Sequence, residues 1–327
     1  MRVCIVGAGA IGGFLGTRLA LSGARVCALA RGTTLVSLRD HGWRLQERSE
    51  LLQAPIALAA DDPHELGRQD LVIIAVKAPA LPLLAPTLAP LIASDTMVLA
   101  AMNGVPWWFN TGIAALGGRP LESVDPAGRI AAAIPFAHVL GCVVHAAATS
   151  VAPGIAQHRM GRGLIVGEPG GEVSARVRAL AALLYDAGFE TTLSERIRYD
   201  IWYKLWGNMT MNPVSALTGA TTDRIQADEL VRAFCSAAMS EAAAVGARIG
   251  CHVRESPEER HAVTRRLGAF KTSMLQDVEA RRPLELDALV GVVREIGQRV
   301  GEPTPNIDAL FALTRLFGAV HGLYPHS

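Results

Sequence analysis

The sequence contains few cysteines, and no two of them have the spacing of a redox or zinc-binding pair. The five are Cys4, Cys27, Cys142, Cys235 and Cys251. An odd number of scattered cysteines without a C-x-x-C pair indicates reduced, packed thiols of a cytoplasmic protein and argues against a disulfide scaffold. The nine histidines form no H-x-x-x-H pair and no cluster with cysteine, so the sequence predicts no metal site.

The sequence also lacks an excess of charge of either sign. It has 31 Lys and Arg residues against 30 Asp and Glu, which leaves a net charge of +1. Composition therefore gives no argument for binding nucleic acid or an acidic membrane. No signal peptide is predicted, because the first apolar run breaks at Gly7 and lacks the regions that such a peptide needs.

One long interval, residues 130–157, contains no Asp, Glu, Lys or Arg. Its composition raises the alternative of a membrane span. Two prolines and two histidines interrupt the interval, however, and residues 139–144 have the pattern of a strand. We therefore predict a pair of buried strands here.

The chain of 327 residues is long enough for two domains, and 50% of its residues are hydrophobic, enough to bury a sizeable core. Apolar runs typical of strands dominate the first part, whereas long helical patterns begin near Ser194. We predict an α/β domain with a doubly wound sheet over residues 1–193 and a helical domain over residues 194–327. The sequence shows no internal repeat.

The first 31 residues carry the clearest motif. An apolar strand ending at Val6 is followed by the glycine loop, then by a helix from Gly13 to about Ser22 and a second strand. The loop consists of Gly7, Ala8, Gly9, Ala10, Ile11 and Gly12. Its three glycines suit a tight turn, close approach of the backbone to a pyrophosphate, and packing of the helix on the strand. The alternative is a glycine turn in a sheet without a cofactor.

The end of the second strand distinguishes between the two nicotinamide cofactors. NAD-binding sites usually place Asp or Glu there to bind the ribose 2′-hydroxyl, but this strand has no acid and is followed by Arg31. A guanidinium suits a 2′-phosphate through charge-assisted hydrogen bonds. We therefore predict NADP(H), with a solvated surface arginine as the alternative.

Two more polar residues follow apolar runs that are typical of parallel strands. Lys77 ends the run 70–77, and Asn103 comes directly after the run 96–102. Ligands of doubly wound sheets lie outside the carboxyl ends of the strands, so these residues are candidates for the same site. Each could instead be an ordinary strand end or turn.

The second domain carries a polar stripe in an apolar setting. Lys204, Asn208 and Asn212 are spaced four residues apart and share one face of a predicted helix, which we expect Pro213 to end. A lysine beside a nicotinamide can stabilise the charge that forms on a ketone oxygen and donate a proton to it. Two amides can hold the substrate in one orientation. The alternative is an exposed polar stripe.

At this point the chain resembles the ketopantoate reductases (2-dehydropantoate 2-reductases) over nearly its whole length. The matching residues are Gly7 to Gly12, Arg31, Val76-Lys77-Ala78, Met102-Asn103-Gly104-Val105, Trp202 to Leu205, Asn208, Asn212-Pro213, Thr272 to Asp277 and Leu284 to Asp287. The resemblance implies a Rossmann domain followed by an all-helical domain, NADPH as the reductant, and reduction of a small 2-oxo acid in pantothenate and coenzyme A biosynthesis. Some members form dimers, so a homodimer is expected.

The resemblance also implies roles for single residues. Lys204 is similar to the catalytic lysine, the general acid towards the keto oxygen, and Glu285 to the second key residue, whose carboxylate contacts the ligands. Asn208 and Asn212 resemble substrate-binding amides, and Ser273 resembles the serine that binds the substrate carboxylate. Lys77 and Asn103 resemble residues at the junction of nicotinamide and substrate.

The chain departs from the family in two places. Ala80 replaces a cofactor-contacting glutamine of some members, and Asn103-Gly104-Val105 continues into an extension that contains Trp107 and Trp108. The extension leaves open another 2-oxo acid as substrate. Two further alternatives are a β-hydroxyacid dehydrogenase, which the downstream serine and glutamate argue against, and a non-catalytic NADPH sensor, which would not need a proton donor.

Overall fold

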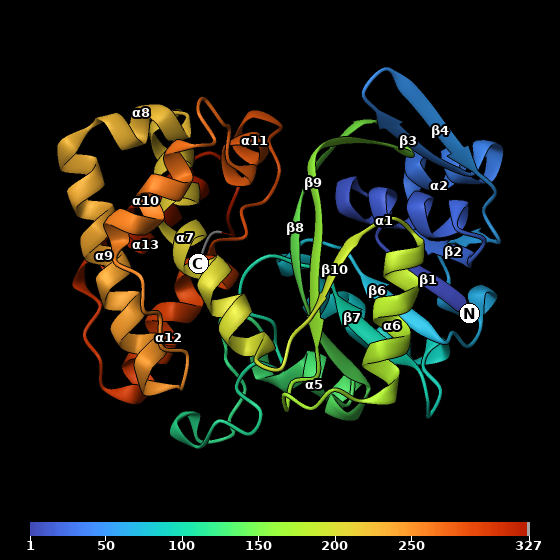
Figure 1. The fold of residues 1–327 in the computed structure, drawn as a ribbon, viewed down its shortest axis with the longest axis horizontal. Helices are drawn as coiled ribbons and strands as arrows, with labels where there is room; N and C mark the ends of the chain where they lie inside the picture. Colours follow the sequence, from blue (N-terminus) through green and yellow to red (C-terminus); the bar gives the residue numbers. More distant parts are fainter. Residues whose placement is uncertain (326–327) are drawn as a thin grey trace. The chain divides into compact units, whose positions relative to one another are not determined.

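The computed structural model describes residues 1–325, and its largest element is one sheet of ten strands (Figure 1). The strands are β1 (Arg2–Val6), β2 (Arg25–Leu29), β3 (Trp43–Glu47), β4 (Glu50–Ala54), β5 (Ala59–Ala60), β6 (Leu71–Ile74), β7 (Met97–Ala100), β8 (Val139–Ala152), β9 (Ile155–Gly167) and β10 (Glu190–Leu193). Their order is β4-β3-β9-β8-β7-β6-β1-β2-β5, with β10 beside β9. Every pair from β5 to β8 is parallel.

The parallel strands form because their sequences are apolar on both faces. All residues of β6 and β7 are buried, as are the last four of β1 and of β2. Strands covered on both sides by helices have continuous apolar runs, which is why runs 70–77 and 96–102 predicted them correctly. The doubly wound α/β class predicted for the N-terminal part is confirmed.

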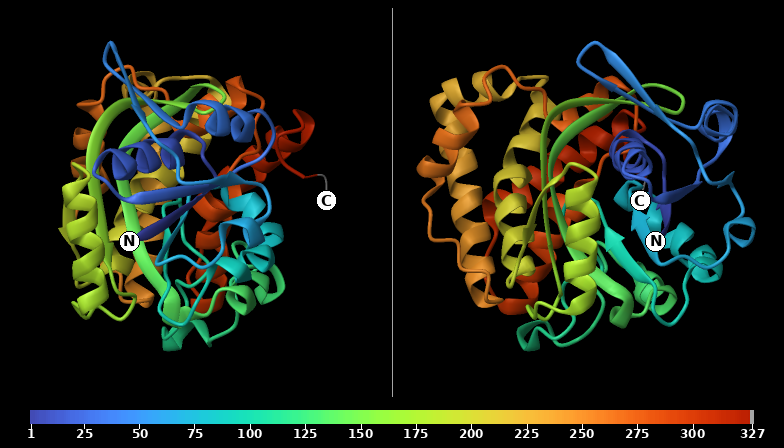
Figure 2. Two further views of the ribbon diagram at one scale, coloured as in Figure 1. Left: turned by 90° about the vertical axis from the view of Figure 1, so that its right-hand side faces the viewer. Right: turned by 45° about the vertical axis from the view of Figure 1, so that its right-hand side comes forward.

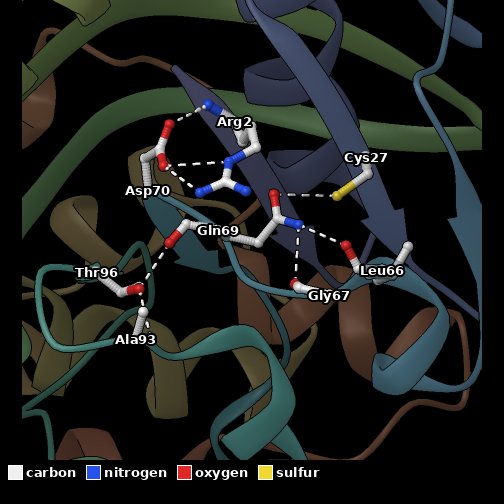
Figure 3. A network of polar contacts seen from close by, with 8 residues as sticks. All are labelled: Arg2, Cys27, Leu66, Gly67, Gln69, Asp70, Ala93 and Thr96. Atoms are coloured by element: carbon white, nitrogen blue, oxygen red, sulfur yellow. Dashed lines mark hydrogen bonds and ion pairs between the residues drawn. The ribbon is translucent and has the colours of Figure 1, made fainter.

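A polar network holds the amino ends of these strands (Figure 3). Asp70 accepts hydrogen bonds from the backbone N–H and the guanidinium of Arg2 at 2.7–3.2 Å, which joins the starts of β1 and β6. The Gln69 amide binds two backbone carbonyls, and its backbone carbonyl accepts from the Thr96 hydroxyl ahead of β7. Structural hydrogen bonds therefore occupy the amino ends, the opposite edge from the glycine loop.

Strands β8 and β9 form a long antiparallel hairpin, drawn in green in Figure 2. The expected strand over 139–144 is confirmed, and β8 and β9 both continue well beyond their buried parts. Near the turn, the Cβ of Ala156 lies 2.9 Å from where a Cβ on Gly13 would stand. Residues 130–157 thus hold most of α5 (Arg129–Ala133), all of β8 and the start of β9 rather than a membrane helix.

Helices and short 3-10 turns connect the strands. They are α1 (Ala10–Leu21), α2 (Gly32–His41), α3 (Pro63–Leu66), η1 (Ala78–Ala80), α4 (Leu81–Leu84), η2 (Ala85–Leu91), α5, η5 (Phe136–His138) and α6 (Ala175–Asp186). Residues 78–91 form three short helical pieces rather than one helix, because their four prolines lack the N–H that a continuous helix needs. Helix α2 was not predicted, because its apolar periodicity is weak.

The chain divides into two compact units that do not follow one another simply along the sequence. The first contains residues 1–102 and 129–200, and the second contains residues 103–128 and 201–325. The Glu295 carboxylate accepts hydrogen bonds from the backbone N–H groups of Glu122 and Ser123, and Arg299 donates to the carbonyl of Arg119 at 2.8 Å. Those bonds fix the inserted segment within the second unit. The domain boundary at residues 193/194 stays a prediction.

Helices make up the second unit. They are η3 (Ala114–Leu116), η4 (Pro126–Gly128), α7 (Ile197–Thr218, whose first turn belongs to the first unit), α8 (Thr222–Ala227), α9 (Glu229–Arg248), α10 (Pro257–Arg265), α11 (Ser273–Glu279), the π-turn η6 (Asp287–Gly291), α12 (Val292–Val300) and α13 (Pro305–Val320). Residues 201–325 contain no strand, so the predicted helical class is confirmed. A capping box between Ser256 and Glu259 starts α10, with a proline in its first turn.

The prediction that α7 ends at Asn212 is wrong. Pro213 lies inside the helix, which continues to Thr218. A proline costs the helix one backbone hydrogen bond, but residues 209–216 are all buried, and the packing of both sides of the helix outweighs that loss. Helix α9 is long and apolar enough to cross a membrane, a property that core helices of soluble proteins share, and it packs against α12 and α13.

Candidate active site

The conformation of the glycine loop in the first unit requires residues without a side chain. Gly7 has φ +91°, and a Cβ on it would lie 2.5 Å from the Val76 side chain. A Cβ on Gly12 would lie 2.0 Å from the carbonyl oxygen of Gly7. A Cβ on Gly9, by contrast, would meet no protein atom within 4 Å. Two of the glycines therefore serve the fold, whereas the third leaves open space beside the backbone.

That open space adjoins the amino end of α1. Gly9 is the N-cap of α1, and no side chain caps the helix and no acid lies in its first turn. A pocket of about 340 Å³ lies beside the loop, lined by Ala8, Gly9, Thr34 and residues 150–155 at the turn of the hairpin. An uncapped helix start beside a pocket presents N–H groups and partial positive charge to an anion. The residues present fit the phosphates of a dinucleotide.

Two cations of the first unit lie at the same edge of the sheet. Arg31 follows β2, is exposed, and forms the N-cap of α2. Lys77 follows β6, is half-buried, and forms the N-cap of η1. Strands β2 and β6 both run parallel to β1, so their carboxyl ends share the edge that carries the glycine loop. No acidic residue follows β2 before Arg31.

The second unit presents the polar stripe on α7. Lys204 and Asn208 are half-buried, whereas the other residues from 205 to 216 are buried. The Lys204 ammonium donates to Oδ1 of Asn103 at 2.8 Å. Asn103, three positions beyond the end of β7, is thus joined to α7 within the second unit. The structure therefore brings two of the predicted site residues together.

A second pair continues the stripe towards the end of α7. Nδ2 of the buried Asn212 donates to Oγ of Ser273 at 3.3 Å. Ser273 is exposed at the first position of α11, behind Thr272, whose hydroxyl caps that helix. Its hydroxyl is open to a ligand while its position is fixed. Asn208 lies between the two pairs along the helix.

Glu285 lies in a buried segment directly before the π-turn. Its side chain is only 8% exposed, and both of its neighbours, Leu284 and Leu286, are buried. A single helical turn that departs from α geometry is frequent at functional sites. The apolar spacing of residues 285–300 is that of an ordinary helix and gives no sign of the π-turn.

The aromatic extension after Asn103 serves packing. Trp107 and Trp108 are 3% and 1% exposed, and the Phe109 ring stacks on Trp202 of α7 at 6.1 Å between centroids. The aromatic side chains thus anchor the inserted segment within the second unit.

The hairpin turn at residues 150–155 and Thr34 line the pocket beside Gly9 and were not expected from the sequence. Only the Pro153-Gly154 dipeptide, a turn signal, marked that position.

Comparison with known proteins agrees with this arrangement. The model of the ketopantoate reductase PanE/ApbA family matches residues 3–171, and the model of its C-terminal domain matches residues 196–317. A 2-dehydropantoate 2-reductase of Mesorhizobium japonicum is 43% identical, over 99% of this chain and 100% of its own length.

Solved structures give the same result. A Ralstonia solanacearum protein provisionally described as a ketopantoate reductase is 57% identical, with a TM-score of 0.95 over 99% of both chains. The 2-dehydropantoate 2-reductase of Methylococcus capsulatus is 27% identical, with a TM-score of 0.81 over 98% of both chains. The chain that carries the glycine loop, the polar stripe on α7 and the helical unit therefore belongs to the ketopantoate reductase family.

Proposed function

We propose that this chain reduces 2-dehydropantoate to pantoate with NADPH, a step of pantothenate and coenzyme A biosynthesis. The observation that carries the proposal is the hydrogen bond from Lys204 to Asn103, made from one of the two half-buried positions in the stretch 204–216 of α7. Lys204 and Asn208 are the half-buried positions of an otherwise buried stretch over residues 204–216, so they present a proton donor and a hydrogen-bonding group to a small polar substrate.

In this proposal the first unit binds the cofactor. Residues 7–12 hold its pyrophosphate, Arg31 binds the 2′-phosphate and selects NADP(H) over NAD(H), and Lys77 lies nearer the nicotinamide. NADPH, when bound, supplies the hydride. The open space at Gly9, the uncapped start of α1 and the adjoining pocket support this assignment.

The second unit would supply the proton and the substrate contacts. Asn103 accepts one N–H of the Lys204 ammonium and so orients it, leaving the lysine to hold the proton needed by the keto oxygen. Asn208, Asn212 and Ser273 would bind the carboxylate and hydroxyl groups of the substrate. Glu285 would contact both ligands, and Asn103 would lie where nicotinamide and substrate meet.

Location and assembly form a separate part of the proposal. All five cysteines are buried thiols, which suits the reducing cytoplasm. A homodimer stays a prediction from the family.

The test is NADPH oxidation against a panel of 2-oxo acids that includes 2-dehydropantoate. We expect 2-dehydropantoate to have the highest kcat/KM and NADH to be a poorer reductant. Preference for another 2-oxo acid would keep the chemistry but replace the substrate. Turnover of 3-hydroxy acids with NADP would favour the β-hydroxyacid dehydrogenase, and tight NADPH binding without any turnover would favour a sensor.

A further inference from the structure

The π-turn after Glu285 is joined to the loop that carries Asn103. The carbonyl oxygen of Ala288, inside the π-turn, accepts a hydrogen bond from the backbone N–H of Val105 at 3.0 Å. Gly104 has φ +82°, and a Cβ on it would lie 2.2 Å from the same oxygen. Only glycine lets the loop approach this closely, so the π-turn sets the position of the backbone next to Asn103.

The far side of the π-turn is held by the end of the chain. The Tyr324 hydroxyl lies 2.8 and 2.9 Å from the two carboxylate oxygens of Asp287, the first residue of the turn. The backbone N–H of Leu284 donates to the carbonyl of Leu323 at 2.9 Å. Residues 323–324 thus bind the chain on both sides of Glu285.

The contact is close-packed as well as polar. A Cβ on Gly318 of α13 would lie 2.8 Å from the Cβ of Tyr324 and 3.3 Å from a methyl group of Leu284. Burial raises the pKa of Asp287, whereas the Tyr324 hydroxyl and nearby Arg315 favour its charged form. The hydrogen bond from the Tyr324 hydroxyl therefore offsets part of the cost of burying the Asp287 carboxylate.

We propose that Tyr324 is a positioning residue for the candidate active site. By binding Asp287 it fixes the π-turn, which carries Glu285 on one side and, through Ala288, holds the Asn103 loop that orients Lys204. Its effect on turnover rests on the proposed function, but its effect on the loop does not.

The test compares Tyr324→Phe with the parent enzyme. The phenylalanine keeps the ring beside Gly318 and removes only the hydroxyl. We expect kcat with the keto acid substrate to fall about 5- to 50-fold, because displaced catalytic groups lower the rate. The affinity for NADPH should stay within about twofold. Hydrogen exchange at the Val105 amide should speed up at least about fivefold, while amides in the middle of α7 exchange as before.

Two further variants serve as controls. Asp287→Asn keeps an oxygen that accepts from Tyr324, so it should retain more activity and more protection at Val105 than Tyr324→Phe. Tyr185→Phe changes a 72% exposed tyrosine on α6 and should alter neither measurement.

Each outcome decides one proposal. If hydrogen exchange at the Val105 amide is unchanged in Tyr324→Phe, the positioning role is overturned, whatever the activity. If the parent enzyme reduces 2-dehydropantoate and Tyr324→Phe has the same kcat, the positioning role is overturned as well. If the parent enzyme reduces no 2-oxo acid, the proposed function fails, and the exchange rates alone still decide whether Tyr324 holds the loop.

Discussion

The candidate site of the first unit is built mainly from backbone atoms, whereas that of the second unit is built from side chains. The first unit uses backbone and empty space, since a Cβ on Gly9 would meet nothing within 4 Å and no side chain caps α1. The second unit uses side chains from segments far apart in the sequence, as the Asn103–Lys204 and Asn212–Ser273 pairs show. A site made of backbone depends on local geometry, whereas a site made of side chains depends on how distant segments pack.

The largest expected effect is in the second unit. Lys204→Ala should lower kcat about 10²- to 10⁴-fold, the usual contribution of a general acid, while the affinity for NADPH changes less than about threefold. Steady-state kinetics and a fluorescence titration of NADPH give the two values. Lys271→Ala, which removes an exposed lysine paired with Glu279, is the matched control and should be near normal. Near-normal turnover of Lys204→Ala would remove the lysine from the mechanism.

Two alanine substitutions in the glycine loop separate its structural from its binding role. Gly12→Ala forces a Cβ against the Gly7 carbonyl and should lower the free energy of unfolding by about 1–3 kcal/mol. Gly9→Ala meets no protein atom and should leave stability unchanged, yet weaken NADPH at least about tenfold by blocking the approach of the pyrophosphate. Denaturant unfolding and NADPH titration measure the pair. Unimpaired NADPH binding by Gly9→Ala would show that the phosphates lie elsewhere.

The choice of cofactor tests the side chain of the first unit that is proposed to select NADP(H). Arg31→Ala should weaken NADPH binding about 10- to 100-fold through loss of charged hydrogen bonds, and leave NADH binding unchanged. Titration with each cofactor measures both affinities. Arg68→Ala, near the opposite edge of the sheet, is the control. An unchanged preference for NADPH would leave Arg31 as a surface residue.

A smaller effect is expected at the exposed end of the stripe. Ser273→Ala should weaken the apparent affinity for the keto acid substrate, measured as its KM, about fivefold. This is the loss expected for one neutral hydrogen bond, and kcat and NADPH affinity should change little. Ser240→Ala on α9 removes a comparable exposed hydroxyl away from the stripe. A selective loss of NADPH affinity in Ser273→Ala would contradict the assignment to substrate.

The smallest expected effect is a pH dependence of the free energy of unfolding, which has opposite signs for one carboxyl group in each unit. Burial raises the pKa of Glu168 in the first unit, but hydrogen bonds from Arg176 and Ser174 lower it more, so its net pKa is depressed. Its stabilisation is present above its unfolded pKa near 4.5 and is lost as pH falls. Burial raises the pKa of Asp287 in the second unit above 3.8, so its contribution is full at low pH and lost as pH rises.

Denaturant unfolding between about pH 3 and pH 7 checks these signs. The stability deficit of Glu168→Gln relative to the parent should grow with rising pH. Asp287→Asn should gain on the parent over the same range. Equal slopes for the two variants would contradict the assignment.

The first unit was largely predictable because its signals are local. Six residues define the glycine loop, and continuous apolar runs define β1, β6 and β7. The hairpin β8–β9 was recognised only where it is buried, since its outer half carries no apolar alternation that requires a strand. Thr34 and the hairpin turn line the pocket through tertiary packing, which the sequence does not state.

The second unit was predictable only in part. The spacing of Lys204, Asn208 and Asn212 placed them correctly on one helix, but the helix end at Pro213 was wrong because burial outweighed the proline. Ser273 and Glu285 had no distinctive local pattern and became candidates only through the family resemblance. The contact between the end of the chain and the π-turn had no signal at all, because nothing in either segment points to the other.

The inserted segment has a consequence for how the protein is made. A ribosome that has synthesised residues 1–200 has completed the first unit, but residues 103–128 still await Glu295 and Arg299. Until α12 emerges, Trp107, Trp108 and Phe109 have no completed core to enter. We therefore expect a fragment that ends at residue 200 to expose these three aromatic side chains and to aggregate more readily than the full chain.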